Sequence, residues 1–350
     1  MAFWYGWYGP PPGLRHWRAA PGEPGFASTD TPVLGAYDSH SADVIDQHLA
    51  WARAAGIDVL ISSWWGPGTY EDESLRLLLD RIEATASPVR AAVYLETWAL
   101  FSGGNFSPKF FTDPNNFTPA GRARARARAV SWISYLLETY GARPGVFRAA
   151  KDAKTAPVIF VYTAALFDPF EWQNIFRRVR AATGIDAFYD ADVEGADVQL
   201  QGRVFDGLHL YNPAPLTLEG DLSLAARVVN RRAAVRDPAA PVADPITVGA
   251  DYRAWAAEAR ALGRSWSATV IPGFDDRKIR NPSFVVSRDH GDGRTYDAFW
   301  RIALQSRPDW VLITSFNEWH EGTEIEQSRE YGDEFLTRTL TWAKRIRLCA

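Results

Sequence analysis

Two glutamates near the C-terminal end of the sequence have the type and spacing of a catalytic pair. Glu318 and Glu321 lie three residues apart, directly after the β-branched and apolar run Trp310–Thr314. Cleavage of a glycosidic bond needs one carboxyl group that protonates the leaving oxygen and a second group that stabilises or attacks the anomeric centre. Two carboxyl groups in one partly dehydrated cleft also drive their pKa values apart, so that one stays protonated near neutral pH. The pair therefore predicts glycoside hydrolysis with Glu318 and Glu321 as the catalytic residues.

The neighbouring residues favour a binding cleft over an exposed loop. An isolated Glu-x-x-Glu is most often a pair of solvated loop charges. Here the pair follows a predicted buried strand and is surrounded by Asn317, Trp319 and His320. The indole offers a stacking wall for a sugar ring, and the amide and imidazole offer hydrogen bonds.

A metal-dependent hydrolase is the alternative raised by the same segment. His320-Glu321 begins like the H-E-x-x-H motif of zinc enzymes, but Glu324 stands in place of the second histidine and no long helix is predicted there. The segment 289–293 resembles a calcium loop without its required spacing, and no G-x-S-x-G nucleophile motif occurs. We therefore expect no metal and no cofactor at the site.

Eight short β-branched or aromatic runs predict the strands that position these residues. They lie at Phe3–Tyr8, Val59–Trp64, Arg90–Leu95, Val158–Tyr162, Ala187–Asp190, Gly207–Leu210, Ser267–Ile271 and Trp310–Thr314. Amphipathic stretches that predict helices alternate with them, at Ser41–Ala55, Glu71–Ala86, Pro119–Tyr140, Pro169–Thr183, Leu222–Arg236, Tyr252–Leu262, Thr295–Ser306 and Glu330–Arg347. This alternation predicts an α/β fold, a single (β/α)₈ TIM barrel that spans residues 1–350 as one domain. A doubly wound open sheet competes, but no G-x-G-x-x-G follows the first strand.

The barrel class places functional residues at the C-terminal ends of its strands. At these predicted ends, or just after them, lie Tyr8, Trp64, Trp65, Glu96, Tyr162, His209 and Tyr211. We predict that these residues bind the substrate together with Asn317, Trp319 and His320.

The composition favours a glycan as the binding partner. Many of the 15 Trp, 13 Tyr and 19 Phe residues lie beside Gly, Pro, Asp or Glu instead of inside apolar runs. Aromatic faces of this kind suit sugars, although core packing is their ordinary role. A net charge of −4 gives no general attraction to nucleic acid or anionic membranes, and no run approaches the roughly 18 apolar residues of a membrane span. We therefore predict an oligo- or polysaccharide substrate and no nucleic-acid or membrane partner, with the oligomeric state left open.

Three further features of the sequence concern the cellular location of the protein, disulfide bonding and a possible nucleic-acid-binding surface. The N-terminal residues lack a basic segment followed by a long apolar stretch, so the sequence predicts a cytoplasmic protein, or a secreted one if a leader has been removed. The single cysteine, Cys349, allows no disulfide within the chain. The alternating arginines of Arg122–Arg128 would spread around a helix, which favours a solvated helix over a nucleic-acid site.

At several of these motifs the sequence resembles glycoside hydrolase family 99, the endo-α-1,2-mannosidases and endo-α-1,2-mannanases. The matching segments are Trp7-Tyr8-Gly9, Pro32–Ser39, Trp51–Asp58, Ser63-Trp64-Trp65 and Ile313–Glu326. The resemblance implies a (β/α)₈ barrel, no cofactor and net retention of configuration, and it implies that Tyr8, Trp65, Glu96 and Tyr211 bind sugar. It also implies a mechanism in which the substrate's own 2-hydroxyl attacks the anomeric carbon and forms a 1,2-anhydro sugar. Glu318 would then deprotonate that hydroxyl, and Glu321 would act as general acid and then general base.

The sequence also departs from the family pattern. The segment between Trp17 and Pro32 is shorter than in the family, and Glu324 stands where the family has glutamine. These differences concern the identity of the glycan and its subsites more than the chemistry. A non-catalytic glycan-binding barrel remains an alternative, which the presence of both Glu318 and Glu321 disfavours.

Overall fold

The computed structural model describes residues 1–10, 12–18, 26–104, 115–194, 198–217, 246–279, 285–286 and 293–349. The helix predicted at Leu222–Arg236 and residues 289–292 of the calcium-like segment lie outside the described residues.

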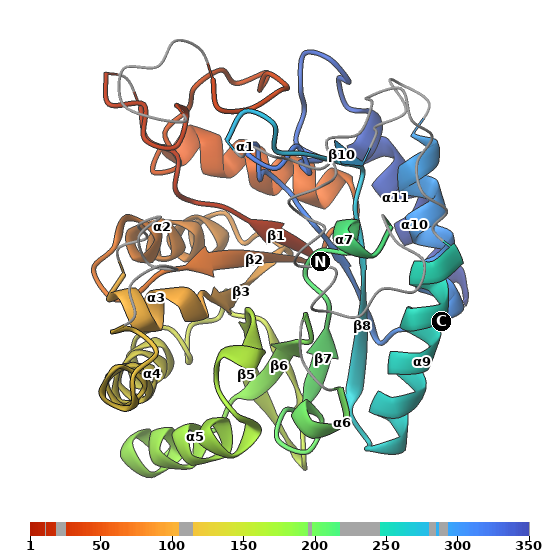
Figure 1. Cartoon of the computed structure of the whole chain (residues 1–350). Coiled ribbons are helices and arrows are strands. Elements are labelled where there is room, and N and C mark those ends of the chain that lie inside the picture. The colour runs from red at the N-terminus through yellow and green to blue at the C-terminus, as the bar shows by residue number, and fades with distance from the viewer. Residues whose placement is uncertain are drawn as a thin grey trace.

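Eight parallel strands form a closed barrel at the centre of the molecule (Figure 1). They are β1 (Ala2–Trp4), β2 (Val59–Trp64), β3 (Arg90–Leu95), β5 (Lys154–Val161), β6 (Phe188–Asp192), β7 (Gly207–His209), β8 (Ser265–Val270) and β11 (Trp310–Ile313). Each strand pairs with its neighbours along the chain, and the first and last strands close the ring where Ala2 pairs with Ile313. The predicted barrel is therefore confirmed, and all eight predicted strands overlap observed ones.

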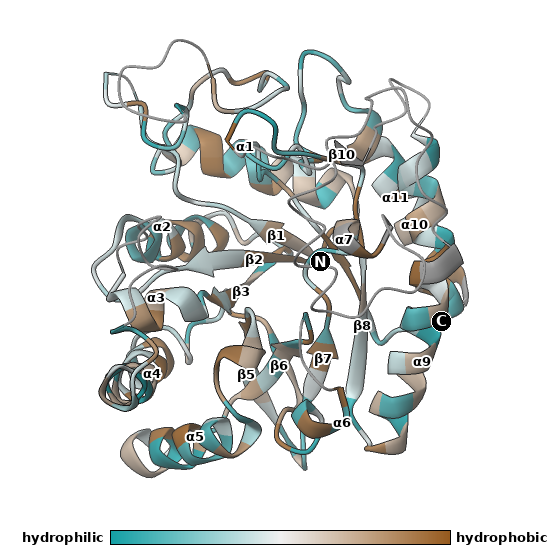
Figure 2. Ribbon diagram, in the orientation of Figure 1, coloured by the Kyte–Doolittle hydropathy of each residue, from teal (hydrophilic) through white to brown (hydrophobic). Residues whose placement is uncertain are grey.

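Helices surround the barrel on its outside (Figure 1). The longer ones are α1 (Ala42–Ala54), α2 (Tyr70–Ala84), α4 (Pro119–Thr139), α5 (Pro169–Thr183), α9 (Ile246–Ala261), α10 (Arg294–Gln305) and α11 (Glu334–Cys349). Shorter ones are α3 (Thr97–Ser102), η2 (Ala164–Leu166), α6 (Val198–Gln201) and α7 (Ala214–Thr217). Figure 2 shows hydrophobic and hydrophilic residues within the same outer helices, as expected for amphipathic helices packed on a sheet.

Local signals in the sequence set several helix ends. The Asp168 side chain accepts from the Phe170 backbone N–H, while the Glu171 side chain accepts from the Asp168 N–H, which together begin α5. Gly184, with φ of 70°, ends the same helix.

Two ion pairs join α4 to α5. Arg122 and Arg126 of α4 lie one turn apart, and both pair with Glu171 of α5.

The observed strands differ from the predicted ones in three places. The first strand ends at Trp4 and not at Tyr8, because the backbone N–H and C=O of Tyr5 bond to the side chain of Asn317 instead of a neighbouring strand. A short strand, β4 (Arg148–Lys151), was not predicted; it pairs antiparallel with the start of β5 outside the barrel. A second small antiparallel pair joins β9 (Phe274–Asp275) to β10 (Val285–Val286).

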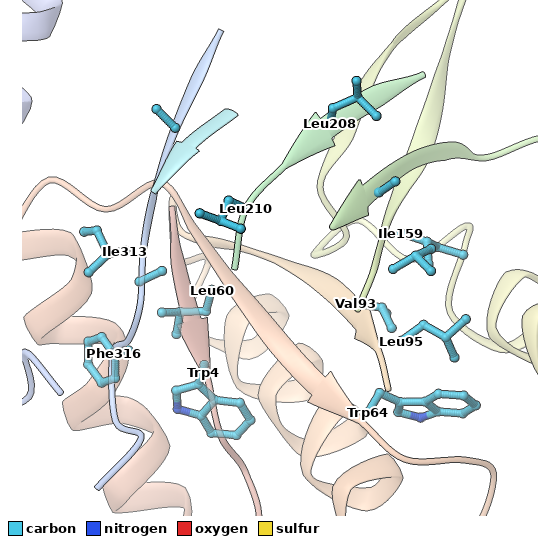
Figure 3. Close-up of a cluster of buried hydrophobic side chains, with 14 of the residues drawn as sticks. Trp4, Leu60, Trp64, Val93, Leu95, Ile159, Leu208, Leu210, Ile313 and Phe316 are labelled. Carbon is cyan, nitrogen blue, oxygen red and sulfur yellow. The ribbon is translucent and has the colours of Figure 1, made fainter. Parts of the chain in front are cut away.

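Two hydrophobic layers follow from the alternation of side chains along each strand. Outward residues such as Trp4, Leu60 and Leu95 pack under the helices, and Figure 3 shows this cluster around the strands. Inward residues such as Phe3 and Phe160 fill the barrel. The inner layer is the floor below the C-terminal strand ends.

Candidate active site

A cavity of about 460 Å³ lies at the C-terminal ends of the barrel strands. Its wall is mostly aromatic and acidic, with residues from β3 and from the segments that follow β1, β2, β3, β5, β7, β9 and β11. The lining residues are Tyr5, Trp7, Arg15, His16, Trp65, Glu71, Tyr94, Glu96, Trp98, Gly104, Tyr162, Tyr211, Ile279, Glu318, His320 and Glu321. Trp65, Glu96, Tyr162, Tyr211, Glu318, His320 and Glu321 among them are candidate site residues of the sequence. Residues at the C-terminal ends of several strands, where this barrel class places its functional residues, therefore meet in one cavity.

The remaining candidates are buried behind this wall. The Trp64 side chain points outward from β2, and its indole N–H donates to Asp72 of α2 at 2.8 Å. His209 points into the barrel interior, where its ring lies 5.4 Å from that of Phe160 and its Nδ1 is 2.7 Å from Asp190. The geometry therefore does not support the predicted substrate contact for Trp64 or His209. Strand alternation turns Trp64 outward under the helices. His209 points inward but lies in the layer of Phe160, below the cavity.

Tyr8, Asn317 and Trp319 hold the backbone on both sides of Glu318. The Tyr8 hydroxyl donates to the Asn317 carbonyl at 3.1 Å and accepts from the Trp319 N–H at 3.0 Å. The Trp319 indole N–H donates to Glu326 at 3.1 Å. These three predicted binding residues thus support the loop instead of lining the cavity.

Glu318 itself is almost fully enclosed, with 2% of its surface exposed. Its N–H donates to the Ser315 hydroxyl at 2.7 Å, and that hydroxyl is 2.9 Å from the hydroxyl of Thr323. Its Oε1 accepts from the backbone N–H of His320 at 3.1 Å. The backbone of Glu321 is fixed in turn, because its carbonyl accepts from the Asp275 N–H at 2.7 Å.

The His320 ring lies between Glu318 and the loop after β1. Its Nε2 bonds to the backbone carbonyl of His16, and because a carbonyl only accepts, Nε2 carries the proton. Its Nδ1 lies 3.7 Å from Glu318 Oε1. The His16 ring stacks on Trp7 with centroids 4.6 Å apart, and burial, followed by the charge of His320, lowers the pKa of His16 to about 3. His16 is therefore a neutral part of the wall.

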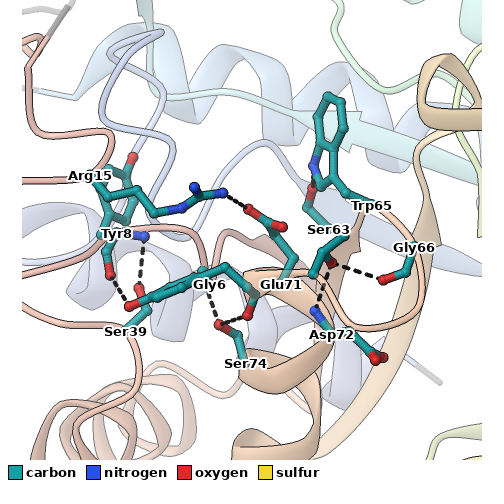
Figure 4. Close-up of polar contacts among 12 residues, drawn as sticks. Gly6, Tyr8, Arg15, Ser39, Ser63, Trp65, Gly66, Glu71, Asp72 and Ser74 are labelled. Atoms are coloured by element: carbon teal, nitrogen blue, oxygen red, sulfur yellow. Dashed lines mark hydrogen bonds and ion pairs between the residues drawn. The ribbon is translucent and has the colours of Figure 1, made fainter. Parts of the chain in front are cut away.

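Glu96 is another buried carboxyl group that lines the cavity. The Ser63 hydroxyl donates to Glu96 Oε1 at 2.7 Å and accepts from the Trp65 indole N–H at 3.1 Å (Figure 4 shows Ser63 and Trp65). Burial raises the pKa of Glu96 to about 8; the Ser63 hydrogen bond opposes this, and the charge of Glu321 adds to it. Glu96 is thus protonated at neutral pH and is able to donate a hydrogen bond.

Four tyrosines, Tyr5, Tyr94, Tyr162 and Tyr211, complete the polar part of the wall. The hydroxyls of Tyr5 and Tyr211 bond to each other. Burial raises the pKa of both phenols well above the ordinary value, and the negative charges of Glu318 and Glu321 add to the rise. The rings of Tyr94, Tyr162 and Tyr211 contact one another, and the Tyr94 centroid lies 5.4 Å from that of Tyr162 and 5.6 Å from that of Tyr211.

Several lining residues were not among the predicted binding residues. Arg15 reaches the cavity from the loop after β1, and its guanidinium bonds to Glu71 at 2.7 Å (Figure 4). Trp7 adjoins the predicted residue Tyr8 and Trp98 lies two residues after the predicted residue Glu96, so proximity to the strand ends was a usable signal for both. No local pattern marks Arg15 and His16, because only the folded loop brings them to the cavity.

Within the residues that the structure describes, no group of three or more His, Cys, Asp or Glu residues is arranged to hold a metal ion. None of the helices in the described ranges combines the length and the hydropathy required to span a membrane.

Comparison with known proteins gives consistent matches in sequence and in fold. The sequence model described as "Glycosyl hydrolase family 99" matches residues 246–336. The chain is 25% identical to a glycoprotein endo-alpha-1,2-mannosidase-like protein of Mus musculus, over 93% of this chain and 69% of that protein. It is also 25% identical to the glycoprotein endo-alpha-1,2-mannosidase of Rattus norvegicus, over 93% of this chain and 67% of that protein. The solved GH99 endo-alpha-mannosidase of Bacteroides thetaiotaomicron superimposes with a TM-score of 0.69 at 25% identity, over 99% of this chain and 97% of that one.

Proposed function

We propose that this chain, a glycoside hydrolase of the family 99 type, cleaves internal α-mannosidic bonds of a glycan with net retention. The observation that carries the proposal is that Glu318 and Glu321 line one cavity together with tryptophan and tyrosine side chains. Such a wall suits a neutral, flat-faced ligand that carries many hydroxyl groups. The names of the mammalian relatives favour an α-1,2-mannoside among the possible linkages.

In the first chemical step, Glu318 takes the proton from the 2-hydroxyl of the mannose residue. Oxygen O2 attacks the anomeric carbon as the bond to the leaving oxygen breaks, and Glu321 gives its proton to that oxygen. In an α-mannoside the axial O2 lies anti to the axial leaving group, which is the geometry that this displacement needs. The products are a 1,2-anhydro sugar, a protonated Glu318 and an ionised Glu321.

In the second step, Glu321 takes a proton from water, and the water oxygen attacks the anomeric carbon. The three-membered ring opens, and O2 recovers its proton from Glu318. Two successive inversions leave the configuration unchanged, and both glutamates return to their starting protonation states. The hydrogen bond from the His320 backbone N–H supports Glu318 in its ionised form at the start of the cycle.

Glu96 has a separate role in this proposal. Because its pKa is about 8, its carboxyl group is neutral at pH 7 and donates a hydrogen bond to a sugar oxygen. Its neutral form also avoids repulsion between two carboxylates once Glu321 has lost its proton in the first step.

The test is incubation of the protein with α-1,2-, α-1,3- and α-1,6-linked manno-oligosaccharides, with the products followed by chromatography and mass spectrometry. The expected result is release of an oligosaccharide from within the α-1,2-linked chain, with the α-anomer seen first by proton NMR. Initial release of the β-anomer, or no cleavage of any α-mannoside, would contradict the proposal. Binding of the same glycans without turnover would favour the non-catalytic alternative.

A further inference from the structure

One buried carboxylate accepts hydrogen bonds from the backbone of three segments that follow barrel strands. Asp192, the last residue of β6, has no exposed surface. Its Oδ2 accepts from the Thr163 N–H at 3.1 Å, and its Oδ1 accepts from the N–H groups of Tyr211 at 3.0 Å and Glu194 at 3.1 Å. These amides belong to the residues two positions beyond the ends of β5, β7 and β6. A single side chain therefore sets the start of three consecutive loops.

Two of these loops present tyrosines to the cavity. Tyr162 directly precedes Thr163, and Tyr211 is itself bonded to Asp192 through its backbone. The two rings meet edge to face with centroids 5.4 Å apart, and both line the cavity. The position of each ring relative to the other thus depends on one carboxylate.

The backbone of Thr163 shows why the carboxylate is needed. Thr163 has φ of 42° and ψ of 56°, in the left-handed region that is unfavourable for a β-branched residue. Such a conformation persists only where surrounding contacts over-determine it. The bond from the Thr163 N–H to Asp192 is one such contact, and the bond from the Thr97 hydroxyl to the Tyr162 carbonyl is another.

We propose that Asp192 is a positioning residue for substrate binding, which holds the Tyr162–Tyr211 wall by fixing the left-handed turn at Thr163 and the backbone of Tyr211. The substrate part of this proposal rests on the proposed function, since the wall must contact a glycan. Asparagine is not equivalent at this position, because its amide nitrogen donates and would face one of the N–H groups.

The test is a double-mutant cycle between Asp192→Asn and Thr163→Gly, since glycine adopts the left-handed conformation without help. On an α-mannoside that the wild type cleaves, D192N should raise KM about tenfold and lower kcat less, as expected when uniform binding is lost. T163G alone should change KM less than about twofold, but in the D192N background it should lower KM by about threefold. An unchanged KM in D192N, or the same effect of T163G in both backgrounds, would overturn the proposal.

Asp190→Asn is the matched control. Asp190 lies two residues earlier on the same strand and is equally buried, but it bonds to the ring of His209 in the barrel interior. D190N and D192N should both lower the thermal midpoint, but D190N should not make KM sensitive to T163G. The same sensitivity in D190N would show a general loss of stability instead of positioning.

A measurement on the wild type covers the case in which D192N does not fold. The amides of Thr163, Glu194 and Tyr211 should exchange with solvent as slowly as those of the barrel strands, although they lie beyond the strand ends. Fast exchange at Thr163 or Tyr211 would overturn the proposal. Slow exchange in a protein that cleaves no α-mannoside would support the positioning of the wall and reject the proposed function alone.

Discussion

The side chain of Asn317 replaces a strand partner for the backbone of Tyr5. Its Oδ1 accepts from the Tyr5 N–H at 2.7 Å, and its Nδ2 donates to the Tyr5 carbonyl at 3.0 Å. The contact joins the end of β1 to the residue before Glu318, across 312 positions of the sequence. Because Tyr5 lines the cavity, this amide fixes the loop of Glu318 relative to the first strand.

Asn317→Asp should therefore damage both stability and activity. An ionised carboxylate still accepts from the Tyr5 N–H, but it repels the Tyr5 carbonyl to which the amide donates. Loss of a buried hydrogen bond with one partner left unsatisfied costs about 1–3 kcal/mol, and a displaced Glu318 should lower kcat. Chemical denaturation and initial rates measure the two effects.

Asn212→Asp is a suitable control for this substitution. The Asn212 side chain accepts from the Ala214 N–H at 2.9 Å, a role that a carboxylate also fills. If N212D loses as much stability and activity as N317D, the specific bridge to Tyr5 is not the reason for the defect.

Strand positions were predictable because β-branched and aromatic runs recur between amphipathic stretches, whereas the direction of each side chain was not. Trp64 and Trp65 are adjacent in the sequence, and both lie at a strand end where function is expected. Which of them faces the cavity depends on how β2 sits in the closed barrel, and a single sequence does not contain that information. The same reasoning applies to His209, whose place in the barrel interior follows from the alternation along β7.

The loop after β1 was less predictable still. Arg15 and His16 reach the cavity through contacts with Glu71 and His320, which lie 56 and 304 positions away along the chain. Tyr5 was predicted as part of a strand because its aromatic neighbours favour one. The bridge from Asn317 ends that strand early, and the competing long-range contact has no local signature.

The proposed roles of Glu318 and Glu321 predict different responses to the leaving group. Glu321→Gln removes proton donation, so a substrate with an acidic leaving group should be slowed much less than a natural glycoside. Glu318→Gln removes the base for the 2-hydroxyl, so all substrates should be slowed by about 10²–10⁴-fold. Steady-state rates on an aryl α-mannoside and on the matching oligosaccharide measure the contrast.

A substrate in which hydrogen or fluorine replaces the 2-hydroxyl tests the same mechanism by a change in the sugar instead of the enzyme. Without the 2-hydroxyl there is no internal nucleophile, and turnover should be almost abolished. A covalent glycosyl adduct on either glutamate, detected by mass spectrometry, would exclude the 1,2-anhydro route and leave glycoside hydrolysis itself in place.

The raised pKa of Glu96 predicts how stability changes with pH. The folded protein holds this proton up to about pH 8, whereas the unfolded chain releases it near the ordinary value of 4.5. The contribution of Glu96 to the free energy of unfolding is therefore greatest below the ordinary value and is lost as the pH rises through 8. Urea denaturation at about pH 5 and about pH 9 measures the change. Glu96→Gln, which stays neutral, should remove this part of the pH dependence.

Glu96 should also affect the pH dependence of catalysis at alkaline pH. If neutral Glu96 donates to the sugar, kcat/KM falls as the pH rises through about 8, and the fall should disappear in E96Q. An unchanged alkaline limb in E96Q would assign that limb to another group.

Trp64 at the end of β2 and Trp65 directly after it offer a paired test of burial under the helices against contact with the substrate. The Trp64 indole is buried under the helices and donates to Asp72, so Trp64→Phe leaves a carboxylate oxygen without this donor and should lower the free energy of unfolding by about 1–3 kcal/mol. Trp65 lines the cavity and donates to Ser63, which bonds to Glu96, so Trp65→Phe should raise KM while the stability changes little. Thermal denaturation and substrate titration of both variants separate the effects. A KM defect in W64F without a matching defect in W65F would mean that the substrate does not contact this wall.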